Sequence, residues 1–201
     1  MTEKEAAGSR AVADRLGWAS LPEVLEASES ALGRGHHLAL VASEGSGVEA
    51  VYALAALLTE EIGSDGAYDS GGVHALVLCS TDERAGRVAR SLSRAVGTDG
   101  GVYLVVGGPE ADGVPEEARI VVSRPSRILP AIRSGRFGTG ALRLLVLDGV
   151  ADLEQLDEWS SVEPLLDAVG SEVRKVAATG RPDSGSIASS PDRWRLVSWP
   201  R

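Results

Sequence analysis

A glycine-containing turn follows the first apolar run of the chain and precedes a segment with a helical pattern. Its sequence is Ala42-Ser43-Glu44-Gly45-Ser46-Gly47-Val48-Glu49. A strand, a glycine-rich turn and a helix in this order are typical of a phosphate-binding loop, where backbone N–H groups and the helix N-terminus surround the phosphates. A working loop also needs a Lys for the β- and γ-phosphates and a hydroxyl for Mg²⁺. Val48 and Glu49 stand at those positions.

Two carboxylates make this turn unsuited to a nucleotide. Glu44 and Glu49 stand where a triphosphate would lie, and like unit charges about 4 Å apart repel by roughly 1 kcal/mol in water and roughly 4 kcal/mol at an effective dielectric of 20. We therefore expect no bound ATP and no other cofactor. An ordinary strand-to-helix turn is the alternative interpretation of this segment.

No other group of residues indicates a catalytic or metal site. His36 and His37 are adjacent near a strand start, while His74 and Cys79 belong to another apolar run, so no zinc-ligand spacing is present. The sequence also lacks a Gly-x-Ser-x-Gly nucleophile elbow with its flanking pattern. We assign no catalytic residue and no metal ligand.

Composition limits the classes of partner and compartment. The chain has 201 residues, is 43% hydrophobic and carries a net charge of −9, which fits one compact domain and disfavours nucleic-acid binding by bulk electrostatics. A single cysteine fits a reducing compartment. The start of the chain is charged, and no apolar run approaches the roughly 20 residues that span a bilayer. We expect a cytoplasmic protein without a membrane segment.

Short runs rich in Val, Leu and Ile alternate with helical segments, which indicates βαβ units. We therefore expect an α/β fold: one parallel sheet of six to seven strands sandwiched between helices. The expected strands are 37–42, 74–79, 102–106, 119–123, 142–148, 174–178 and 194–199, and the expected helices are 48–62, 82–96, 126–133 and 161–169. The second helix carries an arginine stripe (Arg84, Arg87, Arg90 and Arg94), which we interpret as a solvated face, with a partner or RNA surface as the alternative.

Several segments resemble, in order and spacing, the motifs of DEAD-box RNA helicases. The turn at 42–49 resembles A-x-T-G-S-G-K-T, and residues 75–88 resemble the segment around P-T-R-E-L-A. Residues 120–135 resemble the stretch around T-P-G-R, and a Gly-Gly pair resembles the G-G motif. The residues retained at RNA-facing motif positions are Thr81, Gly107, Gly108, Pro125 and Arg127.

The resemblance covers residues 15 to 199 and implies the N-terminal RecA-like domain of the family, a member of the P-loop NTPase superfamily. The segment Asp148-Gly149-Val150-Ala151 falls at D-E-A-D. Asp148 matches the residue that positions Mg²⁺, whereas Gly149 replaces the Glu that activates water, so the attacking water lacks its base. Asp82 stands where the family has an RNA-contacting Arg.

The resemblance therefore implies a degenerate domain. We expect residues 1–14 to form a charged N-terminal segment and 15–201 a single RecA-like domain, with no second one. Our first hypothesis is a non-catalytic pseudo-helicase domain that acts as a protein-interaction or scaffold module, with a protein partner or as a homo-oligomer. A residual RNA-binding module with weak affinity is the second, and a nucleotide-binding switch without hydrolysis is the third.

Overall fold

A computed structural model describes residues 5–20, 22–42, 46–63, 72–97, 101–105, 114–115, 117–180 and 195–198. Its centre is one seven-stranded sheet with the order β3-β4-β2-β5-β6-β1-β7, in which every pairing is parallel. This confirms the expected α/β class. The strands are β1 (Leu38–Val41), β2 (Ala75–Cys79), β3 (Val102–Val105), β4 (Ile120–Ser123), β5 (Leu144–Asp148), β6 (Arg174–Thr179) and β7 (Arg195–Ser198).

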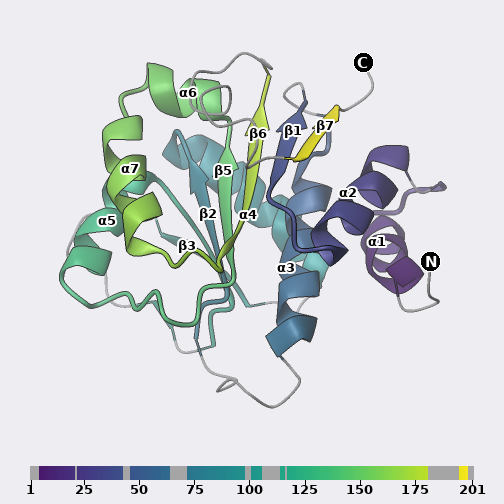
Figure 1. Ribbon diagram of the computed structural model, residues 1–201, viewed down its shortest axis with the longest axis horizontal. Coiled ribbons are helices and arrows are strands. Elements are labelled where there is room, and N and C mark those ends of the chain that lie inside the picture. Colours follow the sequence, from purple (N-terminus) through teal and green to yellow (C-terminus); the bar gives the residue numbers. More distant parts are fainter. Residues whose placement is uncertain are drawn as a thin grey trace.

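The central strands are apolar along their whole length because helices cover both faces of the sheet. Every residue of β2, β4 and β5 is buried. On one face, α1 (Glu5–Arg15), α2 (Glu23–Gly33), α3 (Glu49–Gly63) and α4 (Asp82–Val96) share a core with the sheet. The other face packs on α5 (Pro125–Arg133), α6 (Val150–Gln155) and α7 (Trp159–Ala168). Figure 1 shows the sheet between α1–α3 on one side and α5 with α7 on the other.

Three helices were not expected from the sequence: α1, α2 and α6. Helix α1 overlaps the range interpreted as a charged N-terminal segment, yet Val12 is buried in the core that α1 shares with α3, and Ala13 is buried as well. The compact body therefore begins before residue 15. Most of α1 is small or charged, so its two buried apolar side chains are too few to form a clear apolar stripe.

The carboxyl ends of the strands meet at one edge of the sheet, at the top of Figure 1. The turns after β1, β2, β4, β5 and β6 leave from that edge, which is where open α/β sheets place their ligand sites. Among the described helices, none is long and apolar enough to cross a membrane. The described part of the chain also holds no cluster of three His, Cys, Asp or Glu side chains suited to a metal ion.

Candidate functional site

Asp148, the last residue of β5, is the centre of a buried polar cluster. Its side chain is 2% exposed. Nε of Arg84 donates to its Oδ2 at 2.6 Å, and Nη2 of Arg84 donates to its Oδ1 at 2.9 Å. The hydroxyl of Tyr52, on α3, donates to the same Oδ1 at 2.8 Å. Both carboxylate oxygens of Asp148 are therefore engaged by neighbouring side chains.

Arg84 connects Asp148 to a second carboxylate. Its Nη2 lies 3.1 Å from Oε1 of Glu49, the first residue of α3, and the two side chains are 15% and 12% exposed. The hydrogen bond with Asp148 raises the pKa of Arg84. The expectation of a solvated arginine stripe is therefore wrong for Arg84, because the first turn of α4 lies over the end of the sheet and directs this side chain inward.

A cleft of about 460 Å³ opens beside this cluster. It lies at the carboxyl edge of the sheet and combines hydroxyl, charged and small apolar groups. Leu156 lies on its wall and is 52% exposed. The lining residues are Ala42, Val48, Ser80, Thr81, Arg84, Arg87, Asp148, Gly149, Ala151, Asp152, Gln155, Leu156, Ala178, Thr179 and Gly180.

The turn expected to resemble a phosphate loop is described from Ser46 onward, and Glu44 and Gly45 lie outside the described residues. Gly47 has φ 83°, and a Cβ placed on it would lie 3.4 Å from the indole of Trp18. Val48 is buried in the core. Val48 therefore offers the cleft an apolar surface at the position where the resemblance places a phosphate-binding Lys.

The turn after β5 has a backbone that suits glycine. Gly149 has φ 76°, and a Cβ there would lie 3.0 Å from Oδ2 of Asp152. This conformation starts α6, in which Val150 is buried and Ala151 lines the cleft. A carboxylate-bearing residue at 149 would meet both backbone strain and the Asp152 carboxylate.

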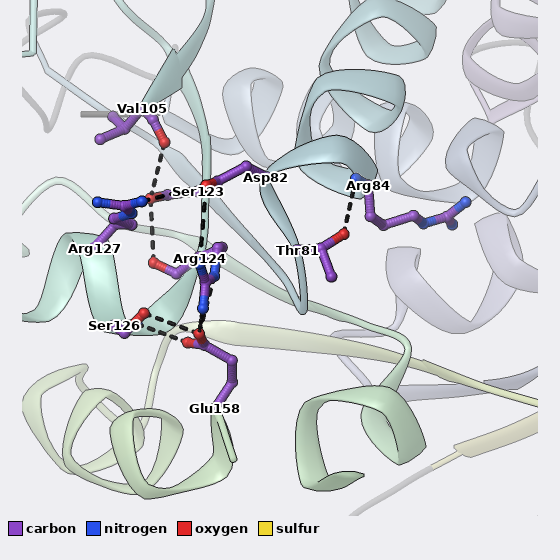
Figure 2. A network of polar contacts seen from close by, with 9 residues as sticks. All are labelled: Thr81, Asp82, Arg84, Val105, Ser123, Arg124, Ser126, Arg127 and Glu158. Atoms are coloured by element: carbon purple, nitrogen blue, oxygen red, sulfur yellow. Dashed lines mark hydrogen bonds and ion pairs between the residues drawn. The ribbon is translucent and has the colours of Figure 1, made fainter. Parts of the chain in front are cut away.

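Of the residues expected to face RNA, the structure brings three together at the ends of the neighbouring strands β2 and β4. Thr81 caps α4, where its hydroxyl accepts from the N–H of Arg84 at 3.1 Å. Pro125 is buried at the first position of α5. Arg127 donates to Oδ2 of Asp82 at 3.3 Å (Figure 2). Gly107 and Gly108 lie outside the described residues.

Glu158 completes this network from the start of α7, as Figure 2 shows. Its carboxylate, 3% exposed, accepts from the N–H and the hydroxyl of Ser126, both at 2.9 Å, and from Nε of Arg124 at 2.9 Å. Nη2 of Arg124 also pairs with Glu158, while Nη1 lies 3.8 Å from Asp82. The N-terminus of α5 and both neighbouring arginines are thus matched by carboxylates of the same chain.

Sequence reasoning missed three residues of the site: Tyr52, Arg84 and Glu158. Arg84 had a usable signal, because it falls at the Leu of the P-T-R-E-L-A motif, one helical turn from Thr81. Tyr52 lies within an apolar helix, and Glu158 lies among other acidic residues in a connection. Nothing local distinguishes their side chains as buried partners.

No family model matches the sequence, and no curated protein matches it. Solved structures do match: a DEAD box protein from Methanococcus jannaschii is 18% identical with a TM-score of 0.76, over 95% of this chain and 53% of that one. A Saccharomyces cerevisiae Dbp5 variant bound to Nup159, Gle1, IP6 and ADP is 12% identical with a TM-score of 0.76, over 100% and 53%. A second Dbp5 variant structure, with Gle1 and IP6, is 13% identical with a TM-score of 0.74, over 100% and 51%.

These identities establish the fold alone. The chain has the RecA-like fold of DEAD-box proteins, as the order of its motifs indicated. It spans about half the length of the solved structures that it matches.

Proposed function

We propose that this chain is a catalytically inactive RecA-like domain, derived from the DEAD-box type, that acts by binding protein partners. The observation that carries the proposal is the Glu49–Arg84–Asp148 cluster. It places an internal cation between two carboxylates at the carboxyl edge of the sheet, where a nucleotide-binding domain of this fold would need Mg²⁺ and a lysine.

The cluster opposes nucleotide binding in two ways. For Mg²⁺ to bind Asp148, the carboxylate must first give up its two bonds with Arg84, and removing one partner of a buried pair costs about 3–5 kcal/mol. Second, the motif positions lack the groups that nucleotide chemistry needs: Val48 offers no cation to the phosphates, and Gly149 offers no base to the attacking water. Each loss acts on a different step, so a single substitution does not reverse them together.

The arginines on the surface expected to face RNA are paired with carboxylates of the same chain. Asp82 pairs with Arg127, and Glu158 pairs with Arg124. Proteins bind the phosphates of RNA through arginines, lysines and helix N-termini. Because these arginines are already paired with carboxylates, we expect weak RNA binding at most. The adjacency of Thr81, Pro125 and Arg127 favours a residual RNA-binding module as the second candidate function.

Two observations support a role in binding proteins. The solved Dbp5 structures hold Nup159 or Gle1 on a chain that contains this fold. In the present chain, Leu156 is about half exposed beside the cleft. We propose a cytoplasmic scaffold domain that docks a protein partner or a second copy of itself.

The first experiment is thermal unfolding with Mg²⁺ and ATP. ATP at a hundredfold excess over a micromolar Kd would add about 2.7 kcal/mol of stability to a domain that binds it. We expect no change in Tm and no phosphate release. A rise in Tm of several degrees, or turnover above that of an Asp148→Asn variant, would overturn the proposal.

A triple variant tests whether the site residues cause the loss. Together, Val48→Lys, Glu49→Thr and Arg84→Leu restore three motif residues. The Lys supplies a cation for the phosphates, the Thr supplies a hydroxyl for Mg²⁺, and the Leu leaves Asp148 free of Arg84. A Tm that rises with Mg-ATP in this variant alone supports the cluster as the cause.

Sedimentation over a range of concentrations tests self-association of the native chain. A mass that grows with concentration indicates a homo-oligomer.

The RNA alternative is tested separately by fluorescence anisotropy with a short single-stranded RNA at low and moderate salt. Salt-sensitive binding that Arg127→Ala abolishes would make the chain a residual RNA module. Absence of binding at tens of micromolar removes that candidate and leaves the protein-interaction role.

A further inference from the structure

The amino ends of the strands, at the bottom of Figure 1, form a second edge that the proposed function does not use. Arg174, the first residue of β6, lies there. Thr179, at the other end of the same strand, lines the cleft, so at about 3.3 Å per residue the two positions are roughly 16 Å apart. A ligand at Arg174 would therefore bind at the opposite end of the sheet from the cleft.

Arg174 has an unsatisfied hydrogen-bond donor. Its Nη1 is buried and has no hydrogen-bond partner, and no ion pair of the described residues includes Arg174. Glu172, two residues earlier, has its carboxylate against Gly170. Buried polar groups in folded proteins nearly always have partners, so a guanidinium nitrogen without a protein partner has room for a hydrogen bond to a water, an ion or a ligand.

The rest of the guanidinium group faces the turn between α2 and β1. A Cβ on Gly35 would lie 4.0 Å from Nη2 of Arg174. Arg34 and His36, which flank Gly35, are both exposed. Arg174 itself is only half-buried, so its outer edge can be reached from solvent beside two further basic residues.

The backbone brings more basic residues to this edge. The N–H of Arg174 donates to the carbonyl of Arg143, whose N–H donates to His74, whose N–H donates to Arg119. The N–H of Lys175 donates to Nδ1 of His37 at 3.2 Å. These bonds place Arg119, Arg143 and Arg174 at the starts of neighbouring strands, with His37 and Lys175 beside them.

From this arrangement we infer that Arg174 is the centre of an anion-binding site that takes a phosphate group. The planar guanidinium donates two parallel hydrogen bonds to such an oxyanion, which a Lys cannot do. Burial lowers the pKa of Arg174, which means that its cationic form is disfavoured by the surroundings, and an anion relieves this cost.

Two sources carry this chemistry: a small phosphate ion and the backbone of a nucleic acid strand. Pyrophosphate is the probe for the first, titrated by calorimetry at ionic strength held constant with sodium chloride. A short single-stranded RNA is the probe for the second, followed by anisotropy. Arg174→Met keeps the apolar stem and removes the charge, and Arg90→Met, an exposed arginine on α4, is the matched control.

We expect the native chain and Arg90→Met to bind pyrophosphate equally, and Arg174→Met to bind at least about tenfold more weakly, since one charge-assisted hydrogen bond contributes that much. RNA binding that Arg174→Met weakens and Arg127→Ala leaves unchanged would identify a strand as the source. Its absence would identify a small phosphate.

Two results overturn the inference: no pyrophosphate binding by the native chain, or equal binding by Arg174→Met. Circular dichroism first establishes that Arg174→Met is folded. If it is not, Arg174→Lys replaces it, and it must weaken pyrophosphate binding more than Arg90→Lys does. The outcome is independent of the Mg-ATP experiment, because the two sites lie at opposite ends of the sheet.

Discussion

Arg84, in the first turn of α4, holds both carboxylate oxygens of Asp148, at the end of β5, through bonds of 2.6 and 2.9 Å. The two residues are 64 positions apart in the sequence. The pair ties the strand end to the helix that follows the neighbouring strand β2, and Tyr52 adds a bond from α3. It is therefore a structural cross-link as well as an obstacle to a metal ion.

Arg84→Met should destabilise the domain by about 3–5 kcal/mol, because it leaves Asp148 as a buried carboxylate without a cation. Urea unfolding followed by circular dichroism measures the change. Arg90→Met, on the exposed face of the same helix, should change the free energy of unfolding by less than about 0.5 kcal/mol. Equal effects of the two substitutions would show that the cluster has no special role.

Adding Asp148→Asn to Arg84→Met should recover part of the loss, since the unpaired charge is then removed. The recovery is read as the coupling energy of a double-mutant cycle, and residues in direct contact give about 0.5–3 kcal/mol. Strictly additive losses would mean that the two side chains do not stabilise each other.

Glu158→Gln should destabilise the junction of α5 and α7. The carboxylate accepts from Ser126 and Arg124, and hydrogen bonds to charged groups contribute about 1.5–3 kcal/mol. Glu163→Gln is the control, because that side chain is exposed and accepts one bond from Trp159 at 3.2 Å. A loss of stability no greater than that of Glu163→Gln would argue against the role assigned to Glu158.

Sequence reasoning predicted the sheet well and the site only in part. All seven strands were expected within about two residues of their observed ends, because β2, β4 and β5 are buried on both faces and read as continuous apolar runs. Motif order placed Thr81, Pro125 and Asp148 at one edge of the sheet. The charged partners came from elsewhere in the chain: Arg84 of α4 pairs with Asp148, and Glu158 accepts from the start of α5. The motif position of Arg84 was a signal for the first pair, whereas no local pattern indicates that Glu158 reaches α5.

Gly149→Ala should destabilise the domain by about 1–2 kcal/mol. Its φ of 76° disfavours any residue with a Cβ, and that atom would lie 3.0 Å from Oδ2 of Asp152. The companion variant Gly149→Ala with Asp152→Ala removes the close contact and leaves only the backbone strain. A Tm equal to that of the native chain for Gly149→Ala would exclude the strain.

Alkaline pH should weaken the fold through two buried acids, Cys79 and Tyr52. Burial raises the pKa of both groups, and the nearby Asp148 carboxylate raises each further. In the unfolded chain they ionise near pH 8.5 and 10. Above pH 8.5 the unfolded state therefore binds fewer protons than the folded state, so the free energy of unfolding falls as pH rises, by up to about 1.4 kcal/mol per pH unit for each group.

A cysteine variant separates the two contributions. In Cys79→Ala only the tyrosine remains, and the decline in the free energy of unfolding should begin near pH 10 instead of pH 8.5. The chain suits this measurement because Lys4 and Lys175 are its only lysines, and arginines stay protonated over this range. Urea unfolding at fixed pH values between 7 and about 11 gives the curve. If the decline began at the same pH in both proteins, folding would not raise the pKa of Cys79. That result would contradict a buried, neutral thiol beside Asp148.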